Sequence, residues 1–180
     1  AVLLVLLSPL FLIIYIVLRC TTQGDAFYSQ ERIGKGGRSF MIHKFCTMYP
    51  NSEEGGIPQL TCNNDERFTP VGRWLSAHHL DELPQLWNVL RGDMSFVGYR
   101  PERQYFIDKI MAQDPRYEFL YQIRPGVTSM ATINNGYTDT MEKMLIRLRM
   151  DLEYLEHRSL WLDVKIILTT GLLTVSGRKF

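Results

Sequence analysis

The sequence predicts a mostly helical α+β protein with a small β element and an N-terminal segment embedded in a membrane. Three observations support this fold class. The first eighteen residues carry no charge, several later segments repeat apolar residues at helical spacing, and one short apolar stretch at 40–45 has the composition of a strand. The 180 residues are enough for one domain with its own core.

The N-terminal run AVLLVLLSPLFLIIYIVL is long enough to cross a bilayer as a helix. A cleaved signal peptide is disfavoured, because no basic residue precedes the run and no small-x-small cleavage site follows it. A lipoprotein signal is disfavoured because Arg19, rather than a small residue, precedes Cys20. A buried core helix is less suitable because the run is apolar on every face. A membrane segment is therefore the favoured interpretation.

Within this run, Ser8-Pro9 predicts a kink, because proline lacks the backbone N–H and clashes with the preceding turn. Two topologies remain open on these grounds. The helix either spans the bilayer, where proline is tolerated, or enters one leaflet, turns at Ser8-Pro9 and returns to the same side. In the second, the Ser8 hydroxyl could satisfy a backbone group that proline frees.

The segments that follow alternate between turns and short elements. We expect a loop through 21–40, a strand at 40–45, an irregular excursion at 49–70 and a turn-rich stretch at 124–136. We expect helices near 71–77, from about 81 to before Gly92, within 101–115, and over 141–155. The last segment, 159–180, is a helix with a wide apolar face that either packs on the core or lies in the membrane interface with Trp161 near its start.

The charges of the chain nearly cancel, since 20 basic and 19 acidic residues give a formal net charge of +1. A nucleic-acid-binding protein normally has a strong basic excess, so no nucleic-acid partner is expected. The three cysteines, Cys20, Cys46 and Cys62, lack paired ligand spacing. We expect them to be reduced thiols facing a cytoplasm, with neither a disulfide framework nor a zinc site.

The stretch HHLDELPQLWNVL places Asp81 and Glu82 side by side before a helical run. As a helix N-cap, Asp81 would put Pro84 in the first turn, where its missing N–H costs little. The same position would keep a carboxylate ionised and able to act as a nucleophile. Two adjacent carboxylates can also hold Mg²⁺, which often bridges to substrate phosphates. A zinc site at His78-His79 is disfavoured because no third ligand lies nearby in the sequence.

Cations flank the turns around this acidic pair and suggest an anionic, phosphorylated substrate at a membrane surface. Each of them alone would be a solvated surface charge. They are Lys44, Arg73, Arg91, Arg100 and Arg124.

Several blocks of the chain resemble the bacterial sugar transferases, the monotopic phosphoglycosyl transferases of glycoconjugate assembly. The block LDELPQLWNVLRGDMSFVGYRPE resembles their signature. ERIGKGGRSFMIHKFCTM, TPVGRWL, RPGVTSMATIN and DLEYLEHRSLWLDVKIILTT are similar to further segments in the family's order. The apolar start with Ser-Pro is similar to the family's re-entrant membrane helix.

This resemblance implies a monotopic architecture in a minimal form. Residues 1–22 would be a re-entrant helix-break-helix segment, residues 23–157 the catalytic domain, and residues 158–180 an amphipathic interfacial helix. The protein would lie in the inner membrane with its catalytic domain on the cytoplasmic face. Membrane lipids would be its surroundings, and the sequence leaves a homo-oligomer open.

The resemblance also implies a reaction, the transfer of a sugar-1-phosphate from a UDP-sugar to polyprenyl (undecaprenyl) phosphate, with release of UMP. Asp81 would form a covalent phosphosugar intermediate, Glu82 would help to bind Mg²⁺ or position the lipid phosphate, and Arg100 matches the family's phosphate-binding arginine. Weaker candidates for substrate contacts are Lys44, Arg73, Arg124 and Asp163. Two other classes stay open: a membrane-anchored scaffold in which the acidic pair is only a cap, and a metal-dependent lipid-phosphate phosphatase.

The chain departs from the family pattern at four places. Tyr99 stands where proline is common, Cys46 where arginine is common, and His78-His79 replace small hydroxyl or basic residues. ATINNGYT lacks the arginine of the corresponding family run, which puts nucleotide and sugar contacts in that turn in doubt. None of these differences removes the proposed nucleophile.

Overall fold

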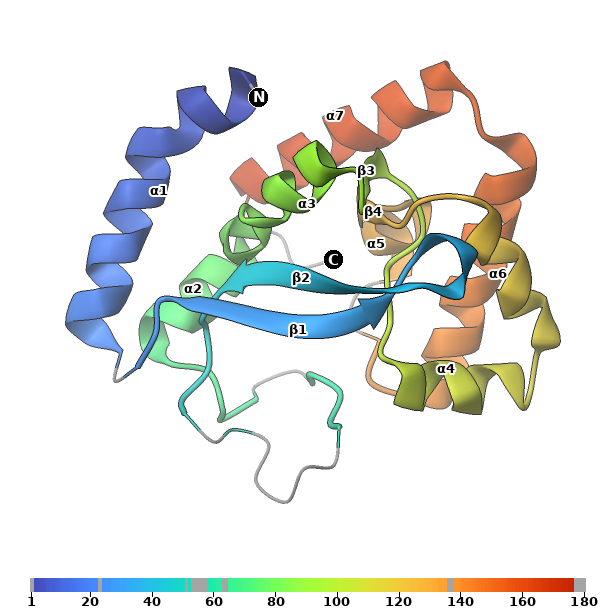
Figure 1. Ribbon diagram of the computed structural model, residues 1–180, viewed down its shortest axis with the longest axis horizontal. Coiled ribbons are helices and arrows are strands. Elements are labelled where there is room, and N and C mark those ends of the chain that lie inside the picture. Colours follow the sequence, from blue (N-terminus) through green and yellow to red (C-terminus); the bar gives the residue numbers. More distant parts are fainter. Residues whose placement is uncertain are drawn as a thin grey trace.

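The computed structural model describes residues 2–22, 24–50, 52, 58–62, 65–135 and 138–176. It confirms a mostly helical α+β fold with small β elements (Figure 1). The α-helices are α1 (Val2–Thr21), α2 (Pro70–Ala77), α3 (Gln85–Arg91), α4 (Gln104–Met111), α5 (Met130–Asn135), α6 (Met141–His157) and α7 (Leu160–Ser176). The 3₁₀ helices are η1 (Lys35–Gly37), η2 (Leu80–Glu82) and η3 (Pro115–Gln122).

Two small sheets complete the fold. Strands β1 (Phe27–Ile33) and β2 (Ser39–Phe45) form an antiparallel hairpin, and β3 (Ser95–Val97) pairs in parallel with β4 (Gly126–Thr128). The predicted strand at 40–45 is confirmed as part of β2. The expected loop through 21–40 is wrong, because it contains β1. The sequence FYSQERI has few apolar residues, and its strand conformation depends on pairing with β2 at all seven positions.

The hairpin turn and the segment 124–136 show how backbone geometry shapes these sheets. Gly36 and Gly37 in η1 have φ values of 70° and 69°, which only glycine adopts without strain, so β1 reverses directly into β2. The stretch 124–136, expected to be turn-rich, contains β4 and the short helix α5 instead. Strands β3 and β4 are each three residues long, which is too short for a periodic signal in the sequence.

Helix α1 runs as one helix through Pro9. The expected helix-break-helix, re-entrant form therefore stays a prediction. The Ser8 hydroxyl donates to the Val5 carbonyl at 2.7 Å. That carbonyl would otherwise accept the N–H that residue 9 lacks, and the predicted role of Ser8 is therefore confirmed. In length and composition α1 is able to cross a membrane, and it is largely exposed. Only Ile14 and Leu18 are buried, in a small cluster that includes Phe45 and Leu75.

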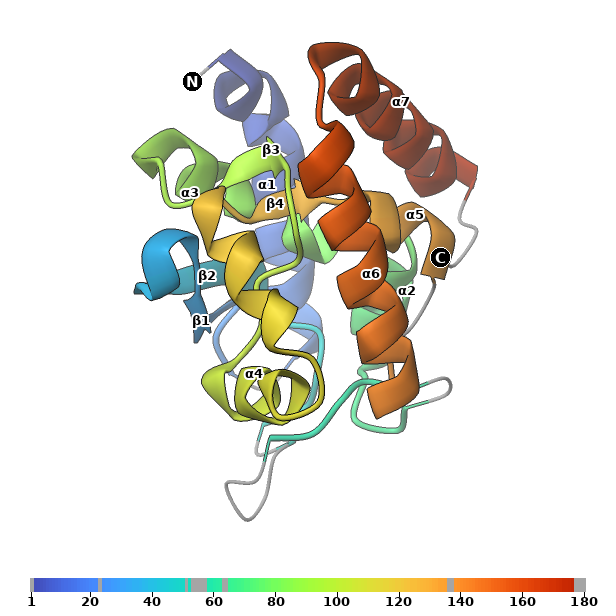
Figure 2. The same ribbon diagram turned by 90° about the vertical axis from the view of Figure 1, so that its right-hand side faces the viewer.

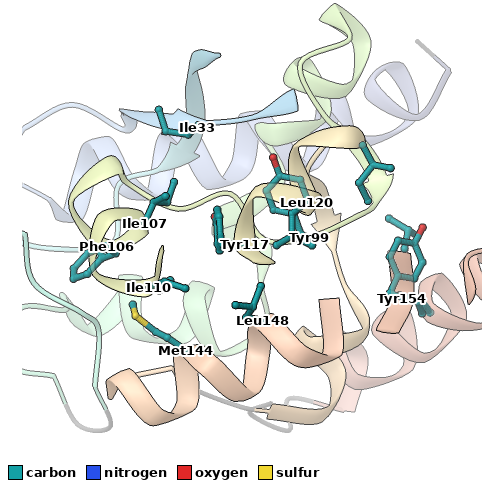
Figure 3. Close-up of a cluster of buried hydrophobic side chains, with 13 residues drawn as sticks. Ile33, Tyr99, Phe106, Ile107, Ile110, Tyr117, Leu120, Met144, Leu148 and Tyr154 are labelled. Atoms are coloured by element: carbon teal, nitrogen blue, oxygen red, sulfur yellow. The ribbon is translucent and has the colours of Figure 1, made fainter. Parts of the chain in front are cut away.

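The main hydrophobic core lies between α4, η3, α6 and the strand β3 (Figure 3). Tyr99 and Tyr117 meet edge to face at its centre, with ring centroids 6.5 Å apart. Leu148 of α6 and Ile107 of α4 are almost fully buried beside them.

Helix α7 lies along one side of the domain and packs on α5, β3 and β4 (Figures 1 and 2). Its Ile166 is 1% exposed and belongs to the core. The opposite face leaves large apolar side chains exposed: Leu160, Trp161, Leu168 and Leu172. Packing of this helix on the core is therefore confirmed. Its placement in the membrane interface stays a prediction, with an exposed apolar face that suits it.

Candidate active site

The acidic pair lies on a 3₁₀ turn between two helices. Helix α2 begins at Pro70 and is capped by Thr69, whose hydroxyl accepts from the Gly72 N–H at 2.9 Å. After α2, His79 adopts a left-handed conformation (φ 52°), which turns the chain into η2. The prediction that Asp81 is a helix N-cap is wrong, because His79 precedes η2 and α3 begins at Gln85 after Pro84. Helix propensities favour acids at exposed helix starts, whereas here the 3₁₀ turn η2 places Asp81 and Glu82 in a buried position.

Asp81 and Glu82 are each only 7% exposed. Glu82 is held by two cations from distant parts of the chain. Lys44 of β2 donates to Oε1 at 2.6 Å, and the guanidinium of Arg100 donates to the same oxygen at 3.2 and 3.1 Å. Three elements therefore meet at this carboxylate, and the predicted grouping of Lys44 and Arg100 with the acidic pair is seen in the structure.

The two carboxylates differ in acidity because their surroundings differ. Burial raises the pKa of Asp81 to about 6, although Lys44 opposes this change. Burial alone would also raise the pKa of Glu82, but Lys44 and Arg100 outweigh it and hold that pKa well below its usual range. Glu82 is thus a fixed negative charge. Asp81 is mostly ionised at neutral pH and poorly solvated, which suits a carboxylate nucleophile.

Both acids line a cavity of about 410 Å³, a size within the range of small-molecule sites. Its basic side chains are Arg32, Lys44, Arg67, Arg100, Arg103 and Arg147, and its acidic side chains are Asp81, Glu82 and Glu102. The chain as a whole is nearly neutral, so positive charge is concentrated here. A cavity of this kind attracts an anionic ligand.

Three of the predicted substrate-binding residues do not line this cavity. Arg73 is exposed on α2 and donates to the Asp65 carbonyl at 3.1 Å. Arg124 is exposed beside β4. Asp163 accepts from the Tyr154 hydroxyl at 2.6 Å and so connects α7 to α6. Contact of these three residues with substrate stays a prediction that the cavity geometry does not support.

The adjacent histidines have separate surroundings. His78 ends α2 and packs its ring on Trp74, with centroids 4.6 Å apart. His79 lines the cavity, and burial lowers its pKa, which favours the neutral imidazole. Among the described residues, no group of three or more His, Cys, Asp and Glu side chains is arranged to hold a metal ion.

Within the part of the chain that the structure describes, the acidic pair is a donor set that could hold a magnesium ion. Both cations contact Oε1 of Glu82, so the groups that would hold the ion are Oε2 of Glu82 and the Asp81 carboxylate. Mg²⁺ commonly uses one or two carboxylates together with substrate phosphates and water, and the residues fit this donor set.

Sequence reasoning missed two features of the site. Asn88 is fully buried, its Oδ1 accepts from the His43 N–H at 3.1 Å and its Nδ2 donates to the Met41 carbonyl at 2.7 Å. The amide therefore occupies the free edge of β2 next to Lys44, as a neighbouring strand would. An asparagine inside a helical run gives no sign of such a partner 45 residues away.

The second missed feature is a buried cluster of Arg32, Glu102 and Arg147. Arg32 donates to Oε2 of Glu102 at 3.1 Å, and Arg147 donates to Oε1 at 2.8 Å. Arg147 also contacts the Thr138 hydroxyl. The three residues come from β1, the loop before α4, and α6, and their separation in the chain hid the cluster.

A family model described as bacterial sugar transferase matches residues 1–177. The chain belongs to the bacterial sugar transferase family. This confirms the resemblance found in the sequence, from the apolar start to the closing helix.

Curated members of the family are similar over nearly the whole chain. A UDP-glucose:undecaprenyl-phosphate glucose-1-phosphate transferase of Caulobacter vibrioides is 42% identical over 98% of this chain and 67% of its own length. A UDP-N-acetylgalactosamine-undecaprenyl-phosphate N-acetylgalactosaminephosphotransferase of Aeromonas hydrophila is 38% identical over 96% of this chain. The chain spans 40% of that relative's length. The exopolysaccharide production protein ExoY of Rhizobium meliloti is 35% identical over 94% of this chain and 79% of its own length.

Proposed function

We propose that this protein transfers a sugar-1-phosphate from a UDP-sugar to undecaprenyl phosphate, through a covalent phosphosugar on Asp81. The observation that carries the proposal is a buried carboxylate beside a Glu82 that is locked by Lys44 and Arg100, in a cavity rich in positive charge. The relatives' names supply the substrate classes, a UDP-sugar and undecaprenyl phosphate.

In the first step, a carboxylate oxygen of Asp81 bonds to the phosphorus that carries the sugar. The bond from this phosphorus to the bridging oxygen breaks, and UMP leaves with the electron pair. In the second step, a phosphate oxygen of the lipid attacks the same phosphorus and breaks its bond to Asp81. The carboxylate is regenerated, and the lipid leaves as a diphosphate-sugar. This order predicts ping-pong kinetics.

The neighbouring residues prepare Asp81 for this role. Lys44 and Arg100 bring positive charge to the place where phosphate oxygens gain charge during the displacement. Glu82 holds both cations in place because it stays ionised. Oε2 of Glu82 and the carboxylate of Asp81 would hold Mg²⁺, which when bound neutralises charge on the diphosphate.

The exposed apolar surfaces agree with a protein seated in one leaflet of the inner membrane, with the cavity on the cytoplasmic side. Helix α1 is apolar around its circumference, and α7 exposes Leu160, Trp161, Leu168 and Leu172. A tryptophan near the start of α7 favours the headgroup level. The re-entrant course of α1 remains part of this proposal. It requires that labels placed before Val2 and after Cys20 react from the same face of the membrane, and labelling from opposite faces would contradict it.

The test is UMP release by purified protein with Mg²⁺, undecaprenyl phosphate and a panel of UDP-sugars. We expect UMP release with at least one donor, and a phosphosugar adduct on the protein when the lipid is omitted. Asp81→Asn keeps the shape of the side chain but removes the nucleophile, so both signals should disappear while the protein still unfolds cooperatively. No UMP with any donor would favour a scaffold, and release of inorganic phosphate from the lipid alone would favour a phosphatase.

A further inference from the structure

We propose that the cluster of Arg32, Glu102 and Arg147 is a second phosphate site, which binds the nucleoside-bearing phosphate of the diphosphate donor. The inference rests on the proposed function and deepens it, because it assigns the two phosphates of the donor to two separate groups of cations in one cavity. The first group is Lys44 and Arg100 on Glu82.

The cluster borders the cavity rather than lying deep in the core. Arg32, Glu102 and Arg147 all line it, and their side chains keep 17%, 9% and 14% exposure. Arg32 is further oriented by Gln30, whose Oε1 accepts from the guanidinium at 2.7 Å. Arg147 is oriented by its contact with Thr138. Both guanidinium groups are therefore fixed in place before any ligand arrives.

The two groups of cations repeat one electrostatic pattern. Each carboxylate is contacted by two cationic side chains: Glu82 by Lys44 and Arg100, and Glu102 by Arg32 and Arg147. Each group therefore has one positive charge more than its central carboxylate. In the first group this excess also faces Asp81, and in the second Asp151 acts electrostatically on Arg147. A diphosphate has two linked anionic phosphates, which would complete both groups at once.

The two groups are also contiguous. Arg100 and Glu102 are two residues apart, on either side of Pro101, and Arg100 acts electrostatically on both Glu82 and Glu102. Adjacent phosphates of one ligand can therefore meet both groups. The single phosphate of the lipid acceptor could satisfy only one of them.

Stability alone does not account for this cluster. Burial lowers the pKa of Arg32 and of Arg147, so the partly dehydrated guanidinium groups are not fully compensated by Glu102. The Nε atoms of both arginines are buried without a hydrogen-bond partner. Buried ion clusters of this composition are often replaceable by apolar side chains without loss of stability, whereas a phosphate ligand needs the charges.

The experiment compares Arg147→Gln with Glu102→Gln in the full chain, purified in lipid nanodiscs. Two readouts are taken: the dissociation constant of uridine diphosphate with Mg²⁺, measured calorimetrically, and the KM values of donor and lipid acceptor. Arg116→Gln is the matched control, because Arg116 is an exposed arginine that pairs with Asp114 away from the cavity. If Arg147→Gln does not fold, Arg32→Gln takes its place.

We expect Arg147→Gln to weaken uridine diphosphate binding about tenfold to a hundredfold, as the loss of a charged hydrogen bond does, and to raise the donor KM. The acceptor KM of Arg147→Gln should stay within about twofold of the parent value, and so should the dissociation constant and both KM values of the Arg116→Gln control. Glu102→Gln keeps both arginines and removes the competing anion, so it should bind uridine diphosphate at least as tightly.

Three results would overturn the inference. The first is unchanged uridine diphosphate binding in Arg147→Gln. The second is a rise in Arg147→Gln that is confined to the acceptor KM, which would assign the cluster to the lipid phosphate. The third is equal weakening in Arg147→Gln and Glu102→Gln, which would mark a structural ion cluster. A parent protein that releases no UMP with any donor would instead contradict the proposed function.

Discussion

Replacing Lys44 by methionine should move the pH dependence of the reaction, because Lys44 is the main charge that keeps Asp81 ionised against burial. Burial raises the pKa of Asp81 to about 6, and Lys44 is the strongest opposing influence. Removing a nearby opposite charge raises a carboxyl pKa by roughly one to three. The pKa of Asp81 in Lys44→Met should therefore be about 7 or higher.

The consequence for activity follows from the ionised fraction of the nucleophile. With a pKa of about 6, Asp81 is about 90% ionised at pH 7, and with a pKa of about 7 or more it is about 50% ionised or less. The proposed reaction requires the Asp81 carboxylate, so its rate should fall as the pH drops below the pKa of Asp81. The midpoint of this acidic limb should move upward by at least about one pH unit in Lys44→Met.

The assay is single-turnover release of UMP from pH 5 to 9 with the lipid omitted, so that only the first step is observed. Lys44→Arg keeps the charge and should leave the midpoint near that of the parent. Lys109→Met is the matched control, because Lys109 lies on α4 over the Tyr105 ring, away from the cavity. A slower Lys44→Met whose midpoint stays at that of the parent would refute the electrostatic role of Lys44 toward Asp81.

Three further predictions concern the packing around the site. Asn88→Ala leaves the His43 N–H and the Met41 carbonyl of β2, both partly buried, without these partners and should cost about 1–3 kcal/mol in chemical denaturation. An unchanged free energy of unfolding would contradict the role of the Asn88 amide at the edge of β2. Gly72→Ala should be strongly destabilising by thermal unfolding, since its Cβ would lie 1.9 Å from the Thr47 carbonyl oxygen, and a variant with the parental melting temperature would show that α2 can shift. Burial raises the pKa of Asp151 to about 7, so its ionisation opposes folding above its unfolded pKa. The free energy of unfolding of Asp151→Asn minus that of the parent should therefore increase from pH 4 to 7, by at most about 1.4 kcal/mol per pH unit, and then level off. A difference that does not change with pH would exclude this ionisation.

Local patterns in the sequence determined the elements that carry a strong period or punctuation. The charge-free run predicted α1, the leucines of 141–155 predicted α6, and Gly92 marked the end of the helix that follows the acidic pair. Local sequence patterns did not predict elements whose conformation depends on pairing between distant segments. The polar strand β1 and the three-residue strands β3 and β4 exist because of their partners, which no local window contains.

The acidic pair itself was found from the sequence, and the resemblance to the bacterial sugar transferases gave it a chemical role. Its environment was decided by the tertiary structure alone. The left-handed His79 turned Asp81 away from a capping position. Both carboxylates are buried, and the direct contacts of Lys44 and Arg100 with Glu82 separate their acidities. Sequence spacing cannot report burial, because desolvation depends on atoms contributed by every element around a group.

The cationic side chains of the site show the same difference between what the sequence predicts and what the tertiary structure decides. Lys44 and Arg100 could be chosen from the sequence as candidates, but their meeting on one oxygen of Glu82 depends on how β2, η2 and the segment after β3 pack together. Arg32 and Arg147 were not chosen at all, because 115 positions of chain separate them and only Glu102 joins them in space. The sequence by itself determined the family, the long apolar helix α1 and the acidic pair for which we propose a catalytic role. The tertiary structure decided which charges surround that pair, because long-range packing alone sets the distances over which charges act.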